Sequence, residues 1–281
     1  MAGKVDLLIL GAGWTSTFLA PLCASRGVSH AATTRTGRDG TLPFDFDPAS
    51  DAPAPFRALP AARAVLVAFP LRAPGAAARL VRLYRATHGD AGPETLFVAL
   101  GSTGIWDGSP TMQPDTFAWT DRHSPVDPTN ARAAAEEELL ALSPGTARTT
   151  VLDLSGLWGG ARQPRNWVAR VAASKDALRA KGSIHMVHGL DVARAVLAVA
   201  AHPERAAGQR WLLTDTHVYD WWDWAAGWGS EEQQRWVQEL MDEAGVRALP
   251  RPPEMLGRAM DSVEFWRTFG LAPLKGRLGE D

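Results

Sequence analysis

The chain has 281 residues, 46% of them hydrophobic and 21% charged, and its formal net charge is -2. This length and apolar content allow a full hydrophobic core, which excludes disorder as the main state of the chain. Because acidic and basic residues nearly balance and no run of Lys or Arg occurs, the composition also excludes an electrostatic surface for nucleic acid or anionic membranes.

Predicted strands and helices alternate through the first half of the chain. Residues 5–10 form a short apolar run without strict alternation, which is typical of a strand buried on both faces of a parallel sheet. Residues 14–26 then show apolar positions at helical spacing, and Gly27 supplies a helix stop. Further apolar runs predict strands at 29–34, 64–69, 95–100 and 149–154. Helix-like segments are found at 73–88, 130–142 and about 166–180.

Beyond about residue 155 the pattern becomes less regular. A helix is predicted at 190–201 and a strand at 210–214, and a Trp-rich segment follows them. The stretch 37–62, rich in Pro, Asp and Ala, shows no clear amphipathic helix, so we expect a short or irregular connection there. Because strands that alternate with helices imply right-handed crossovers, we predict an α/β fold. It is a Rossmann-type doubly wound parallel sheet with a small C-terminal substrate-binding region.

The residues after the first predicted strand read GAGWTS, which is a G-x-G-x-x-G pattern with Ser16 in the third glycine position. A dinucleotide loop needs a tight turn, close approach of the backbone to the pyrophosphate, and a helix N-terminus aimed at it. Gly11 and Gly13 supply the first two, and Ser16 is small enough for the helix to pack on the strand. The hydroxyls of Thr15 and Ser16 can also reach a phosphate oxygen. We favour a dinucleotide site that includes Trp14 over an ordinary strand-to-helix turn.

The end of the second predicted strand bears on which dinucleotide is bound. NAD-binding folds often place Asp or Glu there to bond the ribose 2'-hydroxyl, whereas this sequence reads AATTRTGRDG. Arg35 and Arg38, with the neighbouring threonine hydroxyls, predict a site for a 2'-phosphate, so NADP is favoured over NAD. Because Asp39 is also close to this strand end, NAD remains an alternative cofactor. The alternative interpretation of both arginines is that they are solvated loop residues.

Six segments in this order resemble the extended short-chain dehydrogenase/reductase superfamily, in particular its atypical branch. They read LILGAGW, AVLVAFP, VALGSTGIWDG, DLSGLWGGAR, MVHGLDVARAVLAV and GQRWLLTD. The resemblance implies an NADP-binding Rossmann domain over residues 1–160. Residues 161–281 then hold the remaining sheet elements and a Trp-rich C-terminal cap, in one compact unit with that domain. The turn containing Phe69 and Pro70 is expected to lie under the cofactor's adenosine.

Catalysis in this superfamily uses a Ser or Thr after the fifth strand and a Tyr-x-x-x-Lys pair on the next helix. Ser102 matches the hydroxyl position, and we expect it to contact the cofactor as well as the substrate. The pair is absent from this chain: its two tyrosines are Tyr84 and Tyr219, and neither is followed by Lys at the fourth position. The resemblance therefore implies the cofactor more directly than the reaction.

Other side chains must replace the missing pair if the chain is catalytic. Arg132, on the expected helix, can take over the lysine's contact with ribose or phosphate, but it cannot easily donate a proton. The titratable residues in the preceding loop are Asp107, Asp121 and His123. We predict His123 as the acid, because histidine ordinarily titrates near neutral pH. The alternative is a surface histidine beside Arg122.

Two tryptophans, Trp106 and Trp158, replace family tyrosines and are expected at the carboxyl ends of strands. Ligands bind in the crevice there, so these two, with Trp119 and Trp167, can line an apolar or aromatic substrate pocket. Packing in the core is an equally good interpretation. Near the predicted helix at 190–201, we expect a structural contact for His188 and a helix N-terminal role for Asp191.

The single cysteine, Cys23, excludes an intrachain disulfide and a thiolate metal cluster, and we expect a buried thiol and no bound metal. No apolar run reaches the roughly 18 residues that a membrane span needs, so we expect a cytoplasmic protein. Its partner is expected to be a small-molecule substrate, and the chain is expected to be a monomer or a homodimer.

Three functions remain open from the sequence. The favoured one is an NADP(H)-dependent oxidoreductase or epimerase-like enzyme that acts on a small carbonyl or carbinol compound through Ser102 and a substitute acid. The second is a non-catalytic NADP(H)-binding sensor or regulatory protein, which the missing Tyr-x-x-x-Lys pair favours. The third is a vestigial cofactor site, which NADPH would fail to stabilise against heat.

Overall fold

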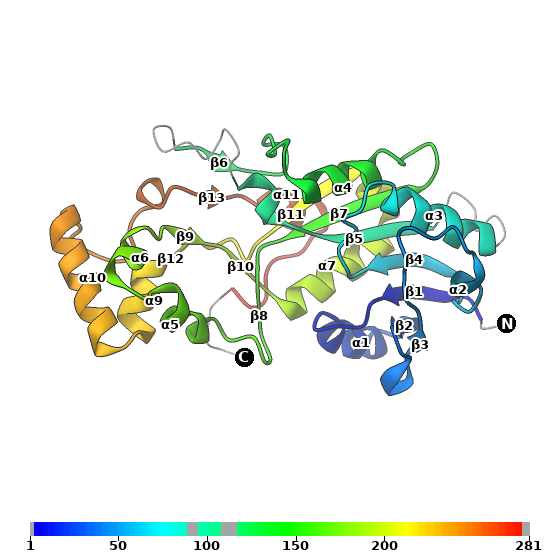
Figure 1. Cartoon of the computed structure of the whole chain (residues 1–281), viewed down its shortest axis with the longest axis horizontal. Coiled ribbons are helices and arrows are strands. Elements are labelled where there is room, and N and C mark those ends of the chain that lie inside the picture. The colour runs from blue at the N-terminus through cyan, green and yellow to red at the C-terminus, as the bar shows by residue number, and fades with distance from the viewer. Residues whose placement is uncertain (1–2, 89–94, 108–116, 277–281) are drawn as a thin grey trace.

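The computed structural model describes residues 3–88, 95–107 and 117–276. Seven strands form its central sheet: β1 (Val5–Leu10), β2 (His30–Thr34), β3 (Leu42–Pro43), β4 (Ala62–Val67), β5 (Leu96–Ser102), β7 (Arg148–Leu154) and β11 (Gln209–Leu213). All neighbouring pairs are parallel, in the order β11-β7-β5-β4-β1-β2-β3 (Figure 1). The chain order reverses between β1 and β4. Sheets of this kind leave a ligand crevice at that point, outside the carboxyl ends of the strands.

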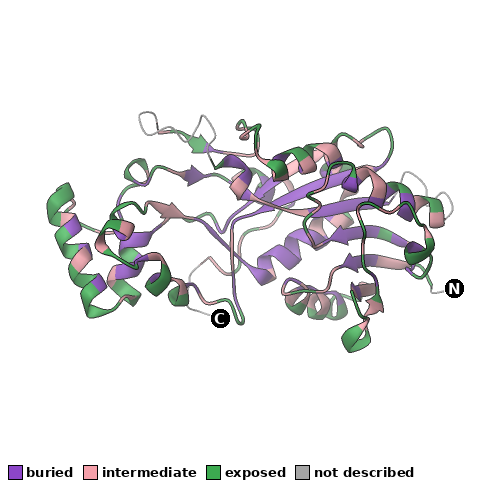
Figure 2. Cartoon of the chain, viewed as in Figure 1, coloured by how far each residue is buried: buried purple, intermediate pink, exposed green. Residues whose placement is uncertain are grey.

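Helices cover both faces of the sheet, as Figure 2 shows by the buried strands between them. One face packs on α1 (Ser16–Ser25), α7 (Gly189–Ala201) and α11 (Val263–Thr268). The other packs on α2 (Ala54–Arg57), α3 (Ala76–Thr87) and α4 (Ala131–Leu140). Successive residues of β1 pack on opposite faces of the sheet. Leu7 and Ile9 belong to the first core, and Leu8 and Leu10 belong to the second. Burial on both faces explains why the sequence of this strand does not alternate.

The rest of the chain forms a C-terminal lobe beside the sheet, with short strand pairs. These pairs are β8 (Gly156–Trp158) with β10 (Met186–His188), β9 (Ser183–Ile184) with β12 (Tyr219–Asp220), and β6 (Trp119–Thr120) with β13 (Ala259–Met260). Its helices are α5 (Val168–Val171), α6 (Lys175–Arg179), α9 (Trp221–Trp228) and α10 (Glu231–Ala244), whereas α8 (Pro203–Ala206) follows α7 and packs against the sheet. Short 3₁₀ turns are η1 (Arg38–Gly40), η2 (Thr103–Trp106), η4 (Pro164–Trp167) and η5 (Pro253–Met255).

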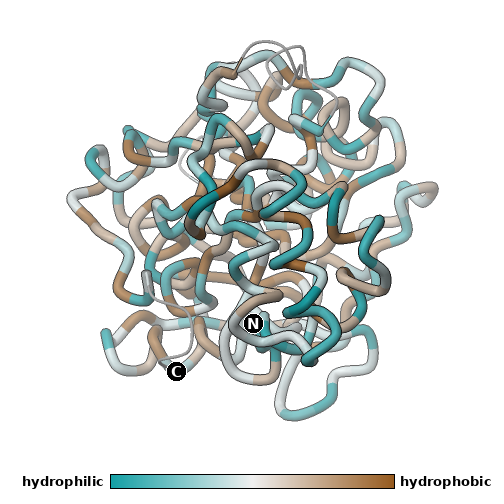
Figure 3. Tube along the Cα trace, turned by 90° about the vertical axis from the view of Figure 1, so that its left-hand side faces the viewer, coloured by the Kyte–Doolittle hydropathy of each residue, from teal (hydrophilic) through white to brown (hydrophobic). Residues whose placement is uncertain are grey.

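A third core fills this lobe, built largely from the tryptophans of α9. Asp220 begins α9 by accepting the backbone N–H of Trp222 at 2.8 Å, and Ser230 begins α10 with a reciprocal capping box to Gln233. Seen from its own side in Figure 3, the lobe alternates hydrophilic and hydrophobic residues along the chain, as expected for helices with one buried face.

The predicted parallel sheet and its strands are confirmed, and the irregular stretch at 37–62 holds only the short elements β3, α2 and η1 in the structure. The single helix predicted at about 166–180 is wrong. Three short pieces, η4, α5 and α6, replace it, because the side chain of Ser174 accepts the N–H of Ala177 at 3.1 Å and starts a new helix. Among the helices of the described residues, none is long and apolar enough to cross a membrane.

Candidate dinucleotide and substrate site

The loop after β1 is shaped to approach a ligand with its backbone. Gly11 has a φ of +92°, a conformation that favours glycine, and a Cβ there would lie only 3.1 Å from the ring of Phe69. Thr33 of β2 holds the loop, since its hydroxyl accepts the N–H of Gly11 at 3.0 Å and its carbonyl accepts that of Ala12 at 2.6 Å.

Beyond Gly11, the same loop leaves donors free at the start of α1. Within residues 3–88, 95–107 and 117–276, the N–H groups of Gly13, Trp14 and Thr15 meet no acceptor. The hydroxyl of Ser16 is buried and likewise finds no partner in that part of the chain. Free N–H groups at a helix N-terminus are the donors that bind phosphate oxygens, and they fit the pyrophosphate of a dinucleotide.

A cavity of about 320 Å³ lies on one side of this loop. Aromatic rings form part of its wall, with Phe46 and Phe69 stacked at 6.1 Å between centroids and 26° between planes. Arg35 and Arg72 also line it, and Arg35 forms an exposed ion pair with Asp45 at 3.5 Å. The combination of flat rings and guanidinium groups fits an adenosine with a phosphate. The second predicted cation of this group, Arg38, is exposed and lies outside the cavity wall.

A second cavity, of about 410 Å³, lies on the other side of the loop. It contains most of the predicted site residues, because both glycines of the loop line it together with Trp14, Thr15, Pro70, Ser102 and Arg132. Gly11 and Pro70 line both cavities, so the two adjoin at the ends of β1 and β4 and together make up the crevice of this site.

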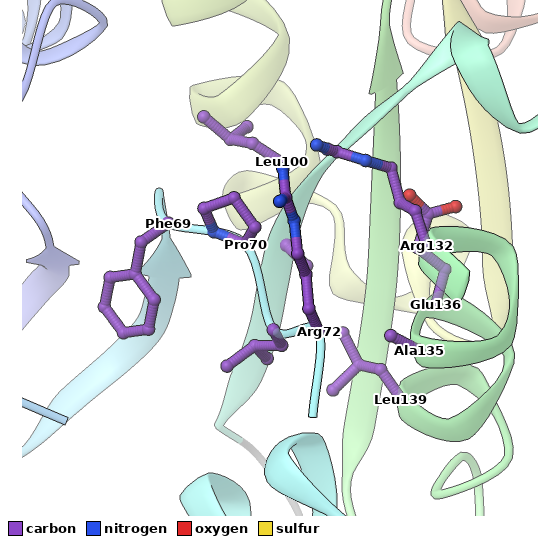
Figure 4. A pocket seen from close by; sticks show the side chains of 10 residues that line it. Phe69, Pro70, Arg72, Leu100, Arg132, Ala135, Glu136 and Leu139 are labelled. Carbon is purple, nitrogen blue, oxygen red and sulfur yellow. The ribbon is translucent and has the colours of Figure 1, made fainter. Parts of the chain in front are cut away.

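A smaller space of about 30 Å³ lies between the two cavities (Figure 4). Arg72, from the loop after β4, and Arg132, from α4, both extend toward Leu100 in this view, while Glu136 lies behind Arg132 on the same helix. The start of α4 is fixed by Asn130, whose side-chain oxygen accepts the N–H of Arg132 at 2.9 Å and whose amide donates to Gly104 at 3.1 Å. This cap holds Arg132 over the strand end that carries Ser102.

Two serines line the second cavity at adjacent strand ends. Ser102 ends β5 opposite Leu154, and Ser155 follows β7 directly. The hydroxyl of Ser102 accepts the N–H of Gly104 at 3.2 Å, which leaves its own proton available to a ligand. The hydroxyl of Ser155 is buried and has no hydrogen-bond partner among the residues that the structure describes. The Ser102 hydroxyl can therefore donate to an oxygen of a small molecule.

Beneath Ser102 lies a buried group of charges. The backbone N–H of Ser102 donates to Asp153, and Arg210 lies 3.1 Å from the other oxygen of that carboxylate. Arg210 also pairs with Glu136 at 3.3 Å and with Glu137 at 2.8 Å. Burial raises the pKa of Glu136 to about 6, and burial together with the neighbouring Glu136 raises the pKa of Asp153 above its ordinary value. The two carboxyl groups therefore take up a proton closer to neutral pH than free carboxylates do.

His123 is not in this crevice. Its ring nitrogen Nε2 lies 3.0 Å from the carboxylate of Glu264, which also binds Arg122, and the side chain is exposed. The structure therefore favours the surface alternative for His123 over the acid. The loop's carboxylates are occupied as well, since Asp107 pairs with Arg258 and Asp121 accepts the hydroxyl of Ser124 at 3.0 Å.

The four tryptophans predicted to line a substrate pocket do not line either large cavity. Trp106 is fully buried and donates its indole N–H to the carbonyl of Ser124 at 3.0 Å. Trp158 is fully buried too, and Trp167 packs against the third core. Trp119 is 51% exposed on β6. Large aromatic rings stabilise the folded state most when they are buried away from water. Trp106 and Trp158 are therefore core residues, and the pocket interpretation is corrected to packing in the core.

The remaining predicted contacts are structural. His188 accepts the N–H of Leu190 at 3.0 Å and so caps α7. Asp191 lies in the first turn of α7, as expected; it is fully buried, pairs with Arg194 at 2.7 Å and accepts the N–H of Leu274 at 3.0 Å. Cys23 is buried as expected, and burial raises the pKa of its thiol to about 11.

Several residues of the crevice were not found from the sequence. They are Phe46, Arg72, Ser155 and Arg162. Arg162 and Ser155 both fall within the DLSGLWGGAR segment, so the resemblance pointed to the right stretch without selecting these side chains. Phe46 lies in the irregular connection, where no periodic pattern indicated a side-chain direction.

Comparisons with known proteins identify the fold. No family model matches the chain, and no curated protein matches it. Solved structures do match over nearly their whole length. A short-chain dehydrogenase/reductase superfamily protein from Agrobacterium tumefaciens with bound NAD is 14% identical, with a TM-score of 0.62 over 95% of this chain and 92% of that one.

Two further structures bear dinucleotides. RMD from Pseudomonas aeruginosa complexed with NADPH is 16% identical, with a TM-score of 0.60 over 97% of this chain and 94% of that one. The dTDP-glucose 4,6-dehydratase from Bacillus anthracis in complex with NAD is 11% identical, with a TM-score of 0.62 over 96% and 92%. The chain thus has the Rossmann-type α/β fold that short-chain dehydrogenase/reductase and epimerase/dehydratase structures share, which confirms the predicted fold class.

Proposed function

We propose that this protein binds a nicotinamide dinucleotide across the crevice and uses it in oxidoreductase or epimerase-like chemistry on a small carbonyl or carbinol compound. The observation that carries the proposal is that the two cavities adjoin at Gly11 and Pro70, beside the free N–H groups at the start of α1. The adenosine half fits the cavity with Phe46 and Phe69, and the nicotinamide half fits the cavity with Ser102.

We further propose that NADP(H) is preferred over NAD(H). The guanidinium groups of Arg35 and Arg72 line the adenosine cavity, and guanidinium groups bind phosphate with paired hydrogen bonds. Asp45 in the same wall opposes a phosphate, but its charge is offset by the ion pair with Arg35. The net charge of the wall therefore favours a 2'-phosphate over a free hydroxyl.

The bound dinucleotide would supply or accept a hydride at the substrate carbon. Ser102 would donate a hydrogen bond to the substrate oxygen, since this residue lines the cavity and its hydroxyl proton is free. The guanidinium of Arg132 would stabilise the negative charge that develops on this oxygen during reduction. The proton would come from solvent through the Ser102 hydroxyl. We assign no proton transfer to His123, because Glu264 holds its ring outside the cavity.

The test combines binding and turnover. NADPH and NADH are titrated calorimetrically, and NADPH consumption is followed at 340 nm, the absorbance wavelength of the reduced nicotinamide, against a panel of aldehydes, ketones and oxo sugars. Ser102→Ala is expected to reduce turnover by about 10²-fold while leaving NADPH affinity within about twofold. Ser25→Ala, an exposed serine at the end of α1, is the matched control. Absence of dinucleotide binding by the wild-type chain would refute the proposal.

A non-catalytic NADP(H)-binding sensor is the second candidate. It is favoured by the missing Tyr-x-x-x-Lys pair and by the charged side chains of the nicotinamide cavity, Arg132 and Arg162, neither of which readily gives up a proton. This candidate predicts tight NADPH binding with no consumption of NADPH on any member of the panel, and equal binding by Ser102→Ala.

A further inference from the structure

Arg162 stands at the edge of the nicotinamide cavity in a position built by the fold. It closes a tight turn with Gly159, in which the N–H of Gly159 donates to Arg162 at 2.9 Å and the N–H of Arg162 donates back at 3.1 Å. Gly159 has a φ of +110°, and a Cβ on it would overlap the buried ring of His188. Neither the conformation nor the space of this turn admits another residue, so Arg162 is held in a defined place.

The side chain of Arg162 lies on the ring of Trp14, with its central carbon 4.4 Å from the ring centroid. Trp14 is itself anchored to the same turn, because its indole N–H donates to the carbonyl of Gly159 at 3.3 Å. Stacking uses the flat face of a guanidinium and leaves the N–H groups along its edge free. In the part of the chain that the structure describes, no carboxylate forms an ion pair with Arg162.

The cavity wall around this edge is cationic. Arg132 and Arg162 are the charged side chains that line the cavity among the described residues, and no Asp or Glu accompanies them. A planar guanidinium edge with no protein acceptor matches the two oxygens of a phosphate or a carboxylate.

We propose that Arg162, held on the ring of Trp14, binds an anionic group of a ligand in the nicotinamide cavity. Two sources have this chemistry, the pyrophosphate of the dinucleotide and an acidic group on the substrate. The inference rests on the proposed function for the identity of the dinucleotide. The anion site itself depends only on the geometry of Trp14, the turn and Arg162.

The experiment compares Arg162→Gln with the wild type and with Arg165→Gln. Arg165 is exposed on the next turn, η4, and lies outside the cavity wall, so its substitution removes the same charge from the same surface. Calorimetry measures the affinities for NADPH, for inorganic pyrophosphate, and for malonate added to the NADPH-saturated protein. Thermal melting confirms that each variant is folded.

A loss in Arg162→Gln on the order of tenfold for NADPH and pyrophosphate supports the proposal and assigns the anion to the dinucleotide. A loss of similar size for malonate alone supports it and assigns the anion to an acidic substrate. Equal affinities in all three proteins, or equal losses in both variants, overturn it. If the wild type binds pyrophosphate or malonate but no dinucleotide, the proposed function fails while the anion site stands.

Discussion

The backbone N–H of Ser102 donates to Oδ1 of Asp153 at 3.0 Å, which ties the hydroxyl-bearing strand end to a fully buried carboxylate on the neighbouring strand. Arg210 and Glu136 complete this buried group. The strand end that carries Ser102 is thus held by a buried group of charges. Two of the predictions below test the packing and the titration of this group.

Gly101 precedes Ser102 and lies directly against the buried carboxylates. A Cβ there would overlap Asp153 and lie 2.7 Å from Oε1 of Glu136, so we expect Gly101→Ala to lower the free energy of unfolding by about 2 kcal/mol. Gly145 has open space around its Cβ position, and Gly145→Ala is expected to change the free energy by less than about 0.5 kcal/mol. Urea unfolding measures both, and equal values for the two variants would contradict the packing described here.

The buried carboxyl of Glu136 predicts a pH-dependent stability. Its pKa rises from the ordinary 4.5 to about 6 on burial, so between these values the folded protein binds more protons here than the unfolded chain. The stabilisation is complete below pH 4.5 and is lost as the pH rises through about 6. The amide of Glu136→Gln does not ionise, so this variant keeps the stabilisation as the pH rises. Its free energy of unfolding relative to the wild type should therefore increase by about 2 kcal/mol between pH 4.5 and pH 7.

The measurement for Glu136→Gln is urea unfolding at several pH values. Glu137→Gln is the control, because Glu137 also contacts Arg210 but is exposed on the same helix. A difference between Glu136→Gln and the wild type that stays constant with pH would show that Glu136 titrates at its ordinary pKa.

Arg35 and Arg38 have different roles in the structure, although the sequence suggested the same one. Arg35 lines the adenosine cavity and Arg38 does not. We expect Arg35→Gln to weaken NADPH binding about tenfold and to leave NADH binding within about twofold, because the lost hydrogen bonds go to the 2'-phosphate. Arg38→Gln should change neither affinity. Calorimetric titration with both dinucleotides checks this. A loss of NADPH affinity in Arg38→Gln would show that Arg38 binds the 2'-phosphate together with Arg35, as the sequence suggested.

The tryptophans separate into structural and surface positions. Trp106 is fully buried with its indole N–H bonded, so Trp106→Ala should lower the free energy of unfolding by about 3–5 kcal/mol. Trp119 is 51% exposed, and Trp119→Ala should cost less than about 1 kcal/mol. Thermal or urea unfolding distinguishes them. If Trp106→Ala kept the stability of the wild type but lost substrate affinity, this ring would have to line a substrate pocket.

The sheet could be predicted from the sequence because burial on both faces leaves a local signature, the continuous apolar run of β1, and because glycine marks the turn after it. The glycine loop could be predicted for the same reason, whereas Ser102 and Arg132 were predicted from the family resemblance of the segments that carry them; all three line the crevice. These features depend on neighbours along the chain, which a sequence displays.

The remainder of the site depends on distant contacts. The sequence makes His123 a reasonable acid, but in the structure its ring contacts Glu264, which comes from a segment far along the chain. Arg162 reaches the crevice because its turn packs on His188 and Trp14, and no local pattern encodes that packing. The role of the tryptophans could not be predicted, because a ring at a strand end can face the core or the crevice with the same spacing along the chain. Only their burial in the folded structure separates the two positions.

The sheet receives its final strand late. β11 (Gln209–Leu213) covers the outer edge of β7, after the chain has left the sheet to build much of the C-terminal lobe. During synthesis, at about 5–20 residues per second, β7 therefore remains an open edge on the order of seconds after it emerges. An unpaired edge is a template for strands of other chains, so the nascent protein is open to aggregation at β7 during this interval.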